Sequence, residues 1–263
     1  MRSGRRLPGA LQRRRLRGHH RQPHSQQQRP LEPRQPLVTP CRLLRLGLTP
    51  YGESLRLQEE LLSQVANGAA QEHLILVEHP HTYTIGRAPA AERHILVPEQ
   101  TLKAEAEVYR IGRGGDVTYH GPGQLVGYPV MNLRQRGRDV HAYVRALEEV
   151  LILTLAEYGI PASREPGLTG VWVGRSKIAA IGIQVRRAVT MHGFALNVTT
   201  DLSRFNRIVP CGISDRGVTS IAALLGRDVP LEGVADRLLP HFGRVFRVSI
   251  EASPNPRHQA PAH

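Results

Sequence analysis

The chain has 263 residues, a formal charge of +13 and only two cysteines, Cys41 and Cys211. Two thiols far apart in sequence give no disulfide framework, and no apolar run approaches the roughly 20 residues that span a bilayer. These features argue against a disulfide-stapled secreted domain and a helical membrane protein, so we expect a soluble protein of the reducing cytoplasm.

Most of the positive charge lies in the N-terminal segment. Residues 1–36 hold ten arginines against one acid, Glu32, and are rich in Gln, Pro and His. A segment with so little to bury is expected to be disordered, and so is the tail 252–263. Four interpretations of residues 1–36 stay open: initiation further on, near Val38, a non-conserved leader from an arginine-rich genome, a mitochondrial transit peptide, or an RNA-binding arm. Residues 37–251 are expected to form one globular domain.

The elements predicted in the first part of the domain alternate between strands and helices. The expected strands are 41–48, 73–79, 82–86, 107–111 and 125–130. The expected helices are 51–67, about 98–105, and 139–158 with Asp139 as its N-cap.

The second part begins with two β-rich stretches, 170–185 and 190–198, and Gly174 to Ser176 form a turn within the first. Helices are expected at 219–225 and at about 231–240, and a last strand at 244–250. Long helices that separate groups of strands indicate an α/β or α+β class with a mixed sheet.

A glycine-rich stretch at 113–124 is the first candidate for chemistry. Four glycines within ten residues let a backbone turn sharply and approach a ligand, and Arg113, Thr118, Tyr119, His120 and Gln124 offer polar contacts. The stretch has neither the Walker pattern nor the dinucleotide-binding pattern. A hairpin loop with no ligand is the alternative.

Lys177 is the second candidate. Only Lys103 and Lys177 are lysines among 35 basic residues, and Lys177 stands among apolar residues. A lysine amine that is partly removed from water can lose its proton and act as a base, whereas arginine stays protonated. The alternative is a surface lysine whose stem covers apolar neighbours.

Cys211 is the third candidate. It stands between Pro210 and Gly212 in a loop-like stretch that can present a thiol, whereas Cys41 fits a buried strand position. A nearby cation would increase its thiolate fraction, so Cys211 and Lys177 would make a workable nucleophile and base.

We expect no metal site. The available ligands are His79, His81, His120, His192 and Cys211, and their spacings match no zinc signature.

Four segments resemble the lipoyl (octanoyl) transferases, in the same order. They are RGGDVTYHGPGQLVGYP from residue 113, KIAAIGIQV from 177, HGFALNV from 192 and IVPCGISDRGVTS from 208. The resemblance covers about residues 41 to 248 and leaves out the basic N-terminal extension. It implies a fold like the catalytic domains of biotin and lipoate protein ligases, a mixed sheet flanked by helices, with 37–251 as the catalytic domain.

The resemblance also implies an activity. Members move an octanoyl group from octanoyl-acyl carrier protein to a lysine of lipoyl domains, in 2-oxoacid dehydrogenase E2 subunits and the glycine cleavage H protein, during lipoate biosynthesis. Cys211 falls at the acyl-thioester nucleophile and Lys177 at the residue that lowers the pKa of that thiol. The other matched positions bind substrate in the family: Arg113, Gly114, Gly115, Asp116, Val117, Thr118, Tyr119, His120, Ala180, Ile181, Gly182, Gly193, Phe194 and Ala195.

This reading requires no cofactor, because a thioester donor is already activated. An apolar slot among Ile181, Ile183 and Phe194 would suit an eight-carbon chain. The alternatives are an ATP-dependent lipoate or biotin ligase on the same fold, which would not need Cys211, and a nucleic-acid-binding protein that uses the basic arm.

Overall fold

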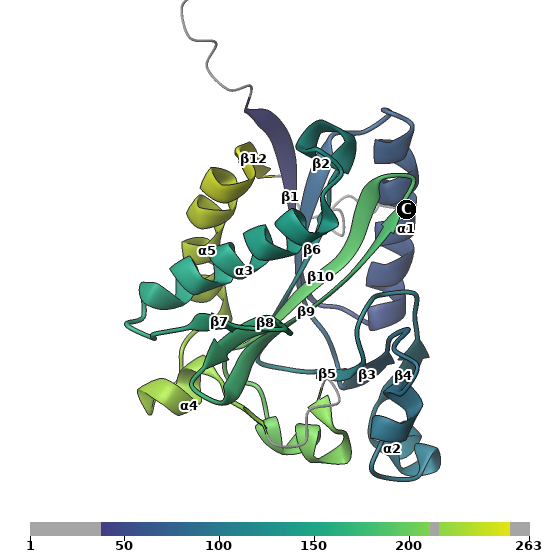
Figure 1. Ribbon diagram of the computed structural model, residues 1–263, viewed down its shortest axis with the longest axis vertical. Coiled ribbons are helices and arrows are strands. Elements are labelled where there is room, and N and C mark those ends of the chain that lie inside the picture. The colour runs from purple at the N-terminus through teal and green to yellow at the C-terminus, as the bar shows by residue number, and fades with distance from the viewer. Residues whose placement is uncertain (1–37, 211–215, 253–263) are drawn as a thin grey trace, which may run out of the picture. The chain divides into compact units, whose positions relative to one another are not determined.

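The computed structural model describes residues 38–210 and 216–252 (Figure 1). The expectations for residues 1–36 and 253–263, and every expectation for Cys211, lie outside the described residues. Ala252, the first residue of the expected C-terminal tail, belongs to the last strand. Among the described residues, no helix is long and apolar enough to cross a membrane.

Nine strands of the described chain form the larger sheet, in the order β12-β1-β2-β6-β10-β9-β8-β7, with β11 beside β9. They are β1 (Thr39–Leu48), β2 (Glu72–Glu78), β6 (Gln124–Val130), β7 (Ser163–Glu165), β8 (Leu168–Val173), β9 (Ser176–Arg186), β10 (Val189–Asn197), β11 (Gly217–Val218) and β12 (Val248–Ala252). Strands β12, β1 and β2 are parallel, whereas β2, β6, β10, β9, β8 and β7 pair antiparallel. The expected mixed sheet is confirmed.

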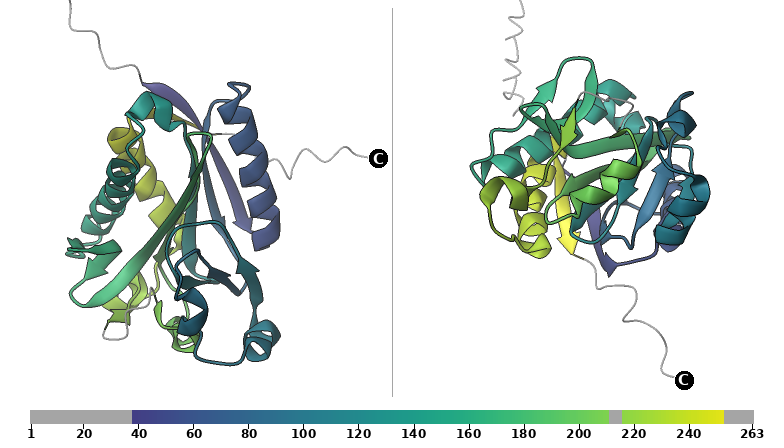
Figure 2. Two further views of the ribbon diagram at one scale, coloured as in Figure 1. Left: turned by 45° about the vertical axis from the view of Figure 1, so that its right-hand side comes forward. Right: turned by 90° about the horizontal axis from the view of Figure 1, so that it is seen from below.

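Helices cover both faces of this sheet (Figure 2). Helix α1 (Tyr51–Ala66) packs on one face, while α3 (Val140–Ala156) and α5 (Leu231–Phe246) pack on the other. Asp139 caps α3 as expected, since its side chain accepts a hydrogen bond of 2.9 Å from the Ala142 amide. The short α4 (Ile221–Leu225) starts after Ser220, which caps it in the same way.

Helix α5 corrects one prediction. It does not end near residue 240 but continues through Pro240 to Phe246, so the strand expected at 244–250 is confined to β12. A proline inside a helix removes one backbone hydrogen bond. Phe242 and Phe246 lie beyond it and are buried in the core, with ring centroids 4.5 Å apart. Burial of these two aromatic rings outweighs the lost bond.

A second, three-stranded sheet has the order β4-β3-β5. Its strands are β3 (Thr82–Ile85), β4 (Glu107–Arg110) and β5 (Val117–His120), and α2 (Glu99–Glu105) precedes β4. Single 3-10 turns lie at η1 (Ala91–His94), η2 (Leu133–Arg136) and η3 (Leu202–Arg207). The glycine-rich stretch therefore contains a strand. The loop before that strand is tied to the larger sheet, because the Gly114 amide donates to the Ile183 carbonyl at 2.8 Å.

Candidate active site

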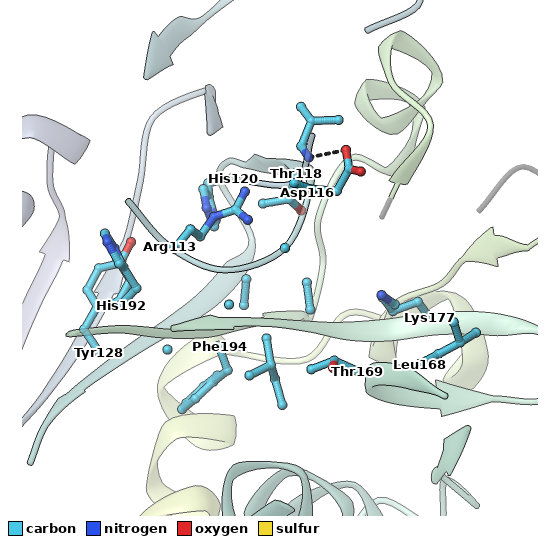
Figure 3. A pocket seen from close by; sticks show the side chains of 18 of the residues that line it. Arg113, Asp116, Thr118, His120, Tyr128, Leu168, Thr169, Lys177, His192 and Phe194 are labelled. Carbon is cyan, nitrogen blue, oxygen red and sulfur yellow. Dashed lines mark hydrogen bonds between the residues drawn. The ribbon is translucent and has the colours of Figure 1, made fainter. Parts of the chain in front are cut away.

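A cavity of about 270 Å³ lies where the glycine-rich loop and β5 face strands β9 and β10 (Figure 3). It is lined by Tyr51, Ala88, Arg113, Gly115, Asp116, Val117, Thr118, His120, Tyr128, Gly167, Leu168, Thr169, Lys177, Ala180, Ile181, Gly182, His192, Gly193, Phe194 and Ala195. Residues far apart in the sequence thus share one cavity, as expected of a ligand site.

All the predicted substrate-binding residues line this cavity except Gly114 and Tyr119. Gly114 ties the loop to β9, and the buried Tyr119 ring packs against Tyr83 and Phe205 instead. Of the expected apolar slot, Ile181 and Phe194 line the cavity, whereas Ile183 does not. Alternation along a strand explains Tyr119, because Thr118 and His120 point to the opposite face of β5.

Arg113 holds the loop in place. Its side chain is buried and donates hydrogen bonds to Thr84, at 2.6 Å to the carbonyl oxygen and 2.9 Å to the hydroxyl. Asp116 fixes the other end of the loop, since its carboxylate accepts from the Val117 amide at 2.7 Å and contacts His94 Nδ1 at 2.7 Å. The loop is therefore a preorganised wall of the cavity.

Lys177 is only 6% exposed and lines one end of the cavity. Figure 3 shows it at the side opposite His192 and Tyr128. Its backbone is held on the outer side by β11, because the Thr219 amide donates to the Lys177 carbonyl at 3.0 Å. This burial agrees with the prediction from the sequence that the Lys177 amine is partly removed from water.

The opposite end of the cavity is polar and was not foreseen from the sequence. Tyr51, Tyr128 and His192 line it, and burial lowers the pKa of His192 to about 4. His192 has a left-handed backbone (φ 58°), which is unusual for a non-glycine residue. Its buried Nδ1 has no hydrogen-bond partner among the described residues. In the sequence, His192 stands out only as a possible metal ligand.

A buried hydrogen-bond chain links the cavity to β11. The Gln124 side-chain oxygen lies 2.8 Å from His120 Nδ1, and the Gln124 amide donates to Asn197 Oδ1 at 2.9 Å. Asn197 in turn donates to the Thr219 carbonyl at 3.0 Å. Burial lowers the pKa of His120 to about 3, so this histidine is neutral at physiological pH. These hydrogen bonds hold Thr219, the residue that follows β11, beside Lys177.

Of the two cysteines, the structure describes Cys41. Cys41 is fully buried in β1, and burial raises the pKa of its thiol to about 12, which confirms an unreactive core position. Cys211 lies outside the described residues. Its sequence neighbour Pro210 lines a void of about 10 Å³ together with Lys177, Ala195 and Asn197. Within the described part of the chain, no three metal-ligating side chains come together.

Residues 50–243 match the family described as "Lipoyl protein ligase A/B catalytic domain". Among similar curated proteins, the octanoyltransferase of Solibacter usitatus is 52% identical over 206 residues, which cover 78% of this chain and 93% of the relative. The octanoyltransferase of Rubrobacter xylanophilus is 50% identical over 202 residues, which cover 76% of this chain and 90% of the relative.

Solved structures share the fold at low identity. A lipoate-protein ligase A bound with ATP superposes with a TM-score of 0.65 at 19% identity, covering 81% of this chain and 88% of the other. A bi-partite lipoate protein ligase from Thermoplasma acidophilum gives 0.63 at 20% identity, covering 82% and 87%. The expected relationship to the ligase fold is confirmed.

Proposed function

Because the chain belongs to the lipoyl protein ligase A/B family and is an acyltransferase like its octanoyltransferase relatives, we propose that it moves an octanoyl group from octanoyl-acyl carrier protein to a lysine of a lipoyl domain. In this proposal the group travels as a thioester on Cys211. The proposed acceptors are lipoyl domains of 2-oxoacid dehydrogenase E2 subunits and the glycine cleavage H protein, which makes the reaction a step of lipoate biosynthesis.

One observation carries the proposal: the chain on both sides of residues 211–215 lies at the buried Lys177. Pro210 lines a void together with Lys177, and β11, which starts at Gly217, pairs with Ser176 and Lys177 of β9. Lys177 also lines the main cavity. A nucleophile carried by this segment would meet both a buried amine and a ligand cavity, which is the arrangement that cysteine nucleophiles require.

The proposed chemistry has two steps. The Lys177 amine takes the proton of the Cys211 thiol, and the thiolate attacks the carbonyl carbon of the donor thioester. The bond to the carrier sulfur breaks, and that sulfur leaves with the proton from Lys177. In the second step the acceptor lysine amine attacks the carbonyl carbon of the acyl-cysteine, the bond to the Cys211 sulfur breaks, and an amide forms. The proton lost by the amine passes through Lys177 to the Cys211 thiolate.

The cavity suits a medium acyl chain. Ile181, Phe194 and Ala195 supply apolar contacts, and Gly182 and Gly193 contribute backbone to the cavity wall. Burial of the seven carbons beyond the carbonyl would contribute about 6 kcal/mol, at roughly 0.8 kcal/mol for each carbon. Backbone N–H groups of the glycine-rich loop are the proposed donors to the oxyanion.

An ATP-dependent ligase is the rival within the same fold, since a structural relative was solved with bound ATP. The two functions differ in the covalent intermediate. A transferase forms an acyl-enzyme without ATP, whereas a ligase activates a free acid and would not need Cys211.

Intact-protein mass spectrometry after incubation with octanoyl-acyl carrier protein tests the proposal. We expect one octanoyl adduct without ATP, its retention in Cys41→Ser and its loss in Cys211→Ser. Lys177→Met is expected to slow adduct formation by about 10²- to 10⁴-fold, the usual contribution of a general base. ATP-dependent formation of modified lipoyl domain by Cys211→Ser would overturn the proposal in favour of a ligase.

A further inference from the structure

The side chain of Lys177 lies against two residues of the neighbouring strand that the proposed chemistry does not use. Trp172 stands directly opposite Lys177 in the β8–β9 register, and Lys177 Nζ lies 4.7 Å from the centroid of the Trp172 ring. A Cβ atom on Gly170 would lie 3.3 Å from Lys177 Cε and 3.5 Å from Cδ. The lysine stem therefore passes Gly170, and its Nζ lies over the indole.

Gly170 is itself held by a buried carboxylate on another element. Glu148 of α3 has a fully buried side chain, and its Oε1 accepts a hydrogen bond of 3.1 Å from the Gly170 amide. Its Oε2 binds Arg145 at 2.7 Å and Arg164 at 3.2 Å, which balances the buried charge. The strand pairing also shifts register between Val171 and Trp172, as a β-bulge beside a functional site does.

The face of Trp172, rather than its N–H group, makes these contacts. Its Nε1 is buried and has no hydrogen-bond partner among residues 38–210 and 216–252, whereas a buried indole N–H is usually bonded. A second cation, the guanidinium of Arg216, lies 5.7 Å from the ring centroid and binds Glu165 at 2.7 Å. A side chain that leaves its only donor unused and contacts two cations is placed for cation–π interaction.

We propose that Trp172 is a positioning residue for Lys177: its ring holds Lys177 Nζ at the cavity and stabilises the ammonium that forms when the amine takes the thiol proton, and Gly170, fixed by Glu148, sets the course of the stem. The contribution to turnover rests on the proposed function, because it requires Lys177 to act on the thiol. Trp172 is also the only tryptophan of the chain, so its fluorescence reports directly on the group above its ring.

The first test compares Trp172→Phe with Trp172→Leu in the rate of acyl-enzyme formation from octanoyl-acyl carrier protein. Phenylalanine lacks the N–H and has a smaller ring system, but it keeps an aromatic face, so we expect it to retain more of the rate than leucine does. Leucine lacks the face, and we expect a loss of roughly 5- to 30-fold in that rate. The KM for the lipoyl domain should stay unchanged in both variants, because the Trp172 side chain is buried and offers no surface to a protein acceptor.

Phe242→Leu is the matched control for a lost buried aromatic ring. Phe242 is fully buried in α5 and belongs to the core on the α3 and α5 face of the sheet. We expect it to lose stability without losing acylation rate at a temperature where the variant is folded. Equal rates for Trp172→Phe and Trp172→Leu, both folded, would show that the aromatic face does not position the lysine.

A second test leaves Trp172 in place and needs no turnover. Tryptophan emission is recorded in a Cys211→Ser background for the parent, Lys177→Arg and Lys177→Met. We expect the emission of Lys177→Arg to resemble that of the parent and the emission of Lys177→Met to differ from it, because arginine keeps a cation over the ring. Identical emission from all three proteins would overturn the inference. A lysine-dependent signal together with no adduct on wild-type Cys211 would instead overturn the proposed function alone.

Discussion

Gly193 lines the cavity at a point where no side chain fits between β10 and β6. A Cβ atom on this residue would lie 2.2 Å from the carbonyl oxygen of Gly127 and 2.8 Å from Pro129 Cδ. We expect Gly193→Ala to lower the free energy of unfolding by about 1–3 kcal/mol, because overpacking forces backbone atoms apart. Urea unfolding measures this loss, and acyl-enzyme formation should fall with it because β10 forms a cavity wall.

Gly233→Ala is the control for this substitution. Gly233 lies in α5, and its Cβ position has no atom within 4 Å. Alanine is the better helix former, so we expect no loss of stability and a gain of up to about 1 kcal/mol. Equal unfolding free energies for the two alanine variants would contradict the close approach at Gly193.

At the scale of single residues, the sequence motifs predicted much of the cavity wall but not the end that Tyr51, Tyr128 and His192 line. Tyr51 and Tyr128 belong to a helix and a strand whose patterns are typical of buried core positions, so nothing local marked them as cavity residues. His192 stood in a recognised segment, but its left-handed backbone arises from tertiary contacts that include a 2.8 Å hydrogen bond from its amide to Gln58 Oε1. Such contacts cannot be seen in one sequence.

At the scale of elements, the turn between β9 and β10 is the clearest case of structure hidden from the sequence. Arg187 and Ala188 form it, with φ values of 54° and 64°. Tight hairpin turns usually take Gly or Asn at such positions, so this stretch of the sequence carries no hairpin signal. The predicted end of helix α5 was wrong for a related reason. Local sequence rules end a helix near Pro240, whereas burial of Phe242 favours its continuation to Phe246.

Ala188 has a left-handed backbone in the turn between β9 and β10, which is a strained conformation for a residue with a Cβ atom. Ala188→Gly removes a Cβ that disfavours the left-handed backbone by roughly 1–2 kcal/mol, while glycine adds about 0.4–1 kcal/mol of chain entropy to the unfolded state. We therefore expect a net gain in unfolding free energy of about 0.5–1 kcal/mol, measured by urea denaturation.

The same exchange in a helix should have the opposite sign. Ala142 is exposed in the first turn of α3, where glycine is a poorer helix former. Ala142→Gly is expected to lose up to about 1 kcal/mol of unfolding free energy. A loss of stability in both variants would mean that the β9–β10 turn holds no strain.

At the scale of the whole chain, the alternation of strands and helices was enough to predict the mixed sheet, and the family resemblance implied the helices that flank it. The strand order was not predicted, because β6 and β10 pair across 58 intervening residues. The formal charge of +13 does not describe the fold itself, because ten of the arginines precede residue 37 and lie outside the described residues.

Among the buried histidines, His79, His120 and His192 contribute most to the pH dependence of stability, and burial lowers the pKa of His73 as well. Burial lowers the pKa of His79 to about 4, of His120 to about 3 and of His192 to about 4. In the unfolded chain these side chains have a pKa of about 6.5. Between about pH 6.5 and pH 4 the unfolded chain therefore binds protons that the folded protein does not, so the folded state loses stability as the pH falls.

Each such histidine contributes about 1.4 kcal/mol for each pH unit within that window, or roughly 4 kcal/mol for all three. We expect the urea midpoint to be steady above pH 7 and to fall steeply between pH 6.5 and pH 5. His79→Gln keeps hydrogen-bonding groups near Thr49 and Tyr128, which His79 now contacts at 2.7 and 2.8 Å, but it cannot titrate. This variant should lose about a third of the slope, whereas exposed His141→Gln should keep it. A slope that is the same in both variants would show that burial of His79 does not set the acid sensitivity of the fold.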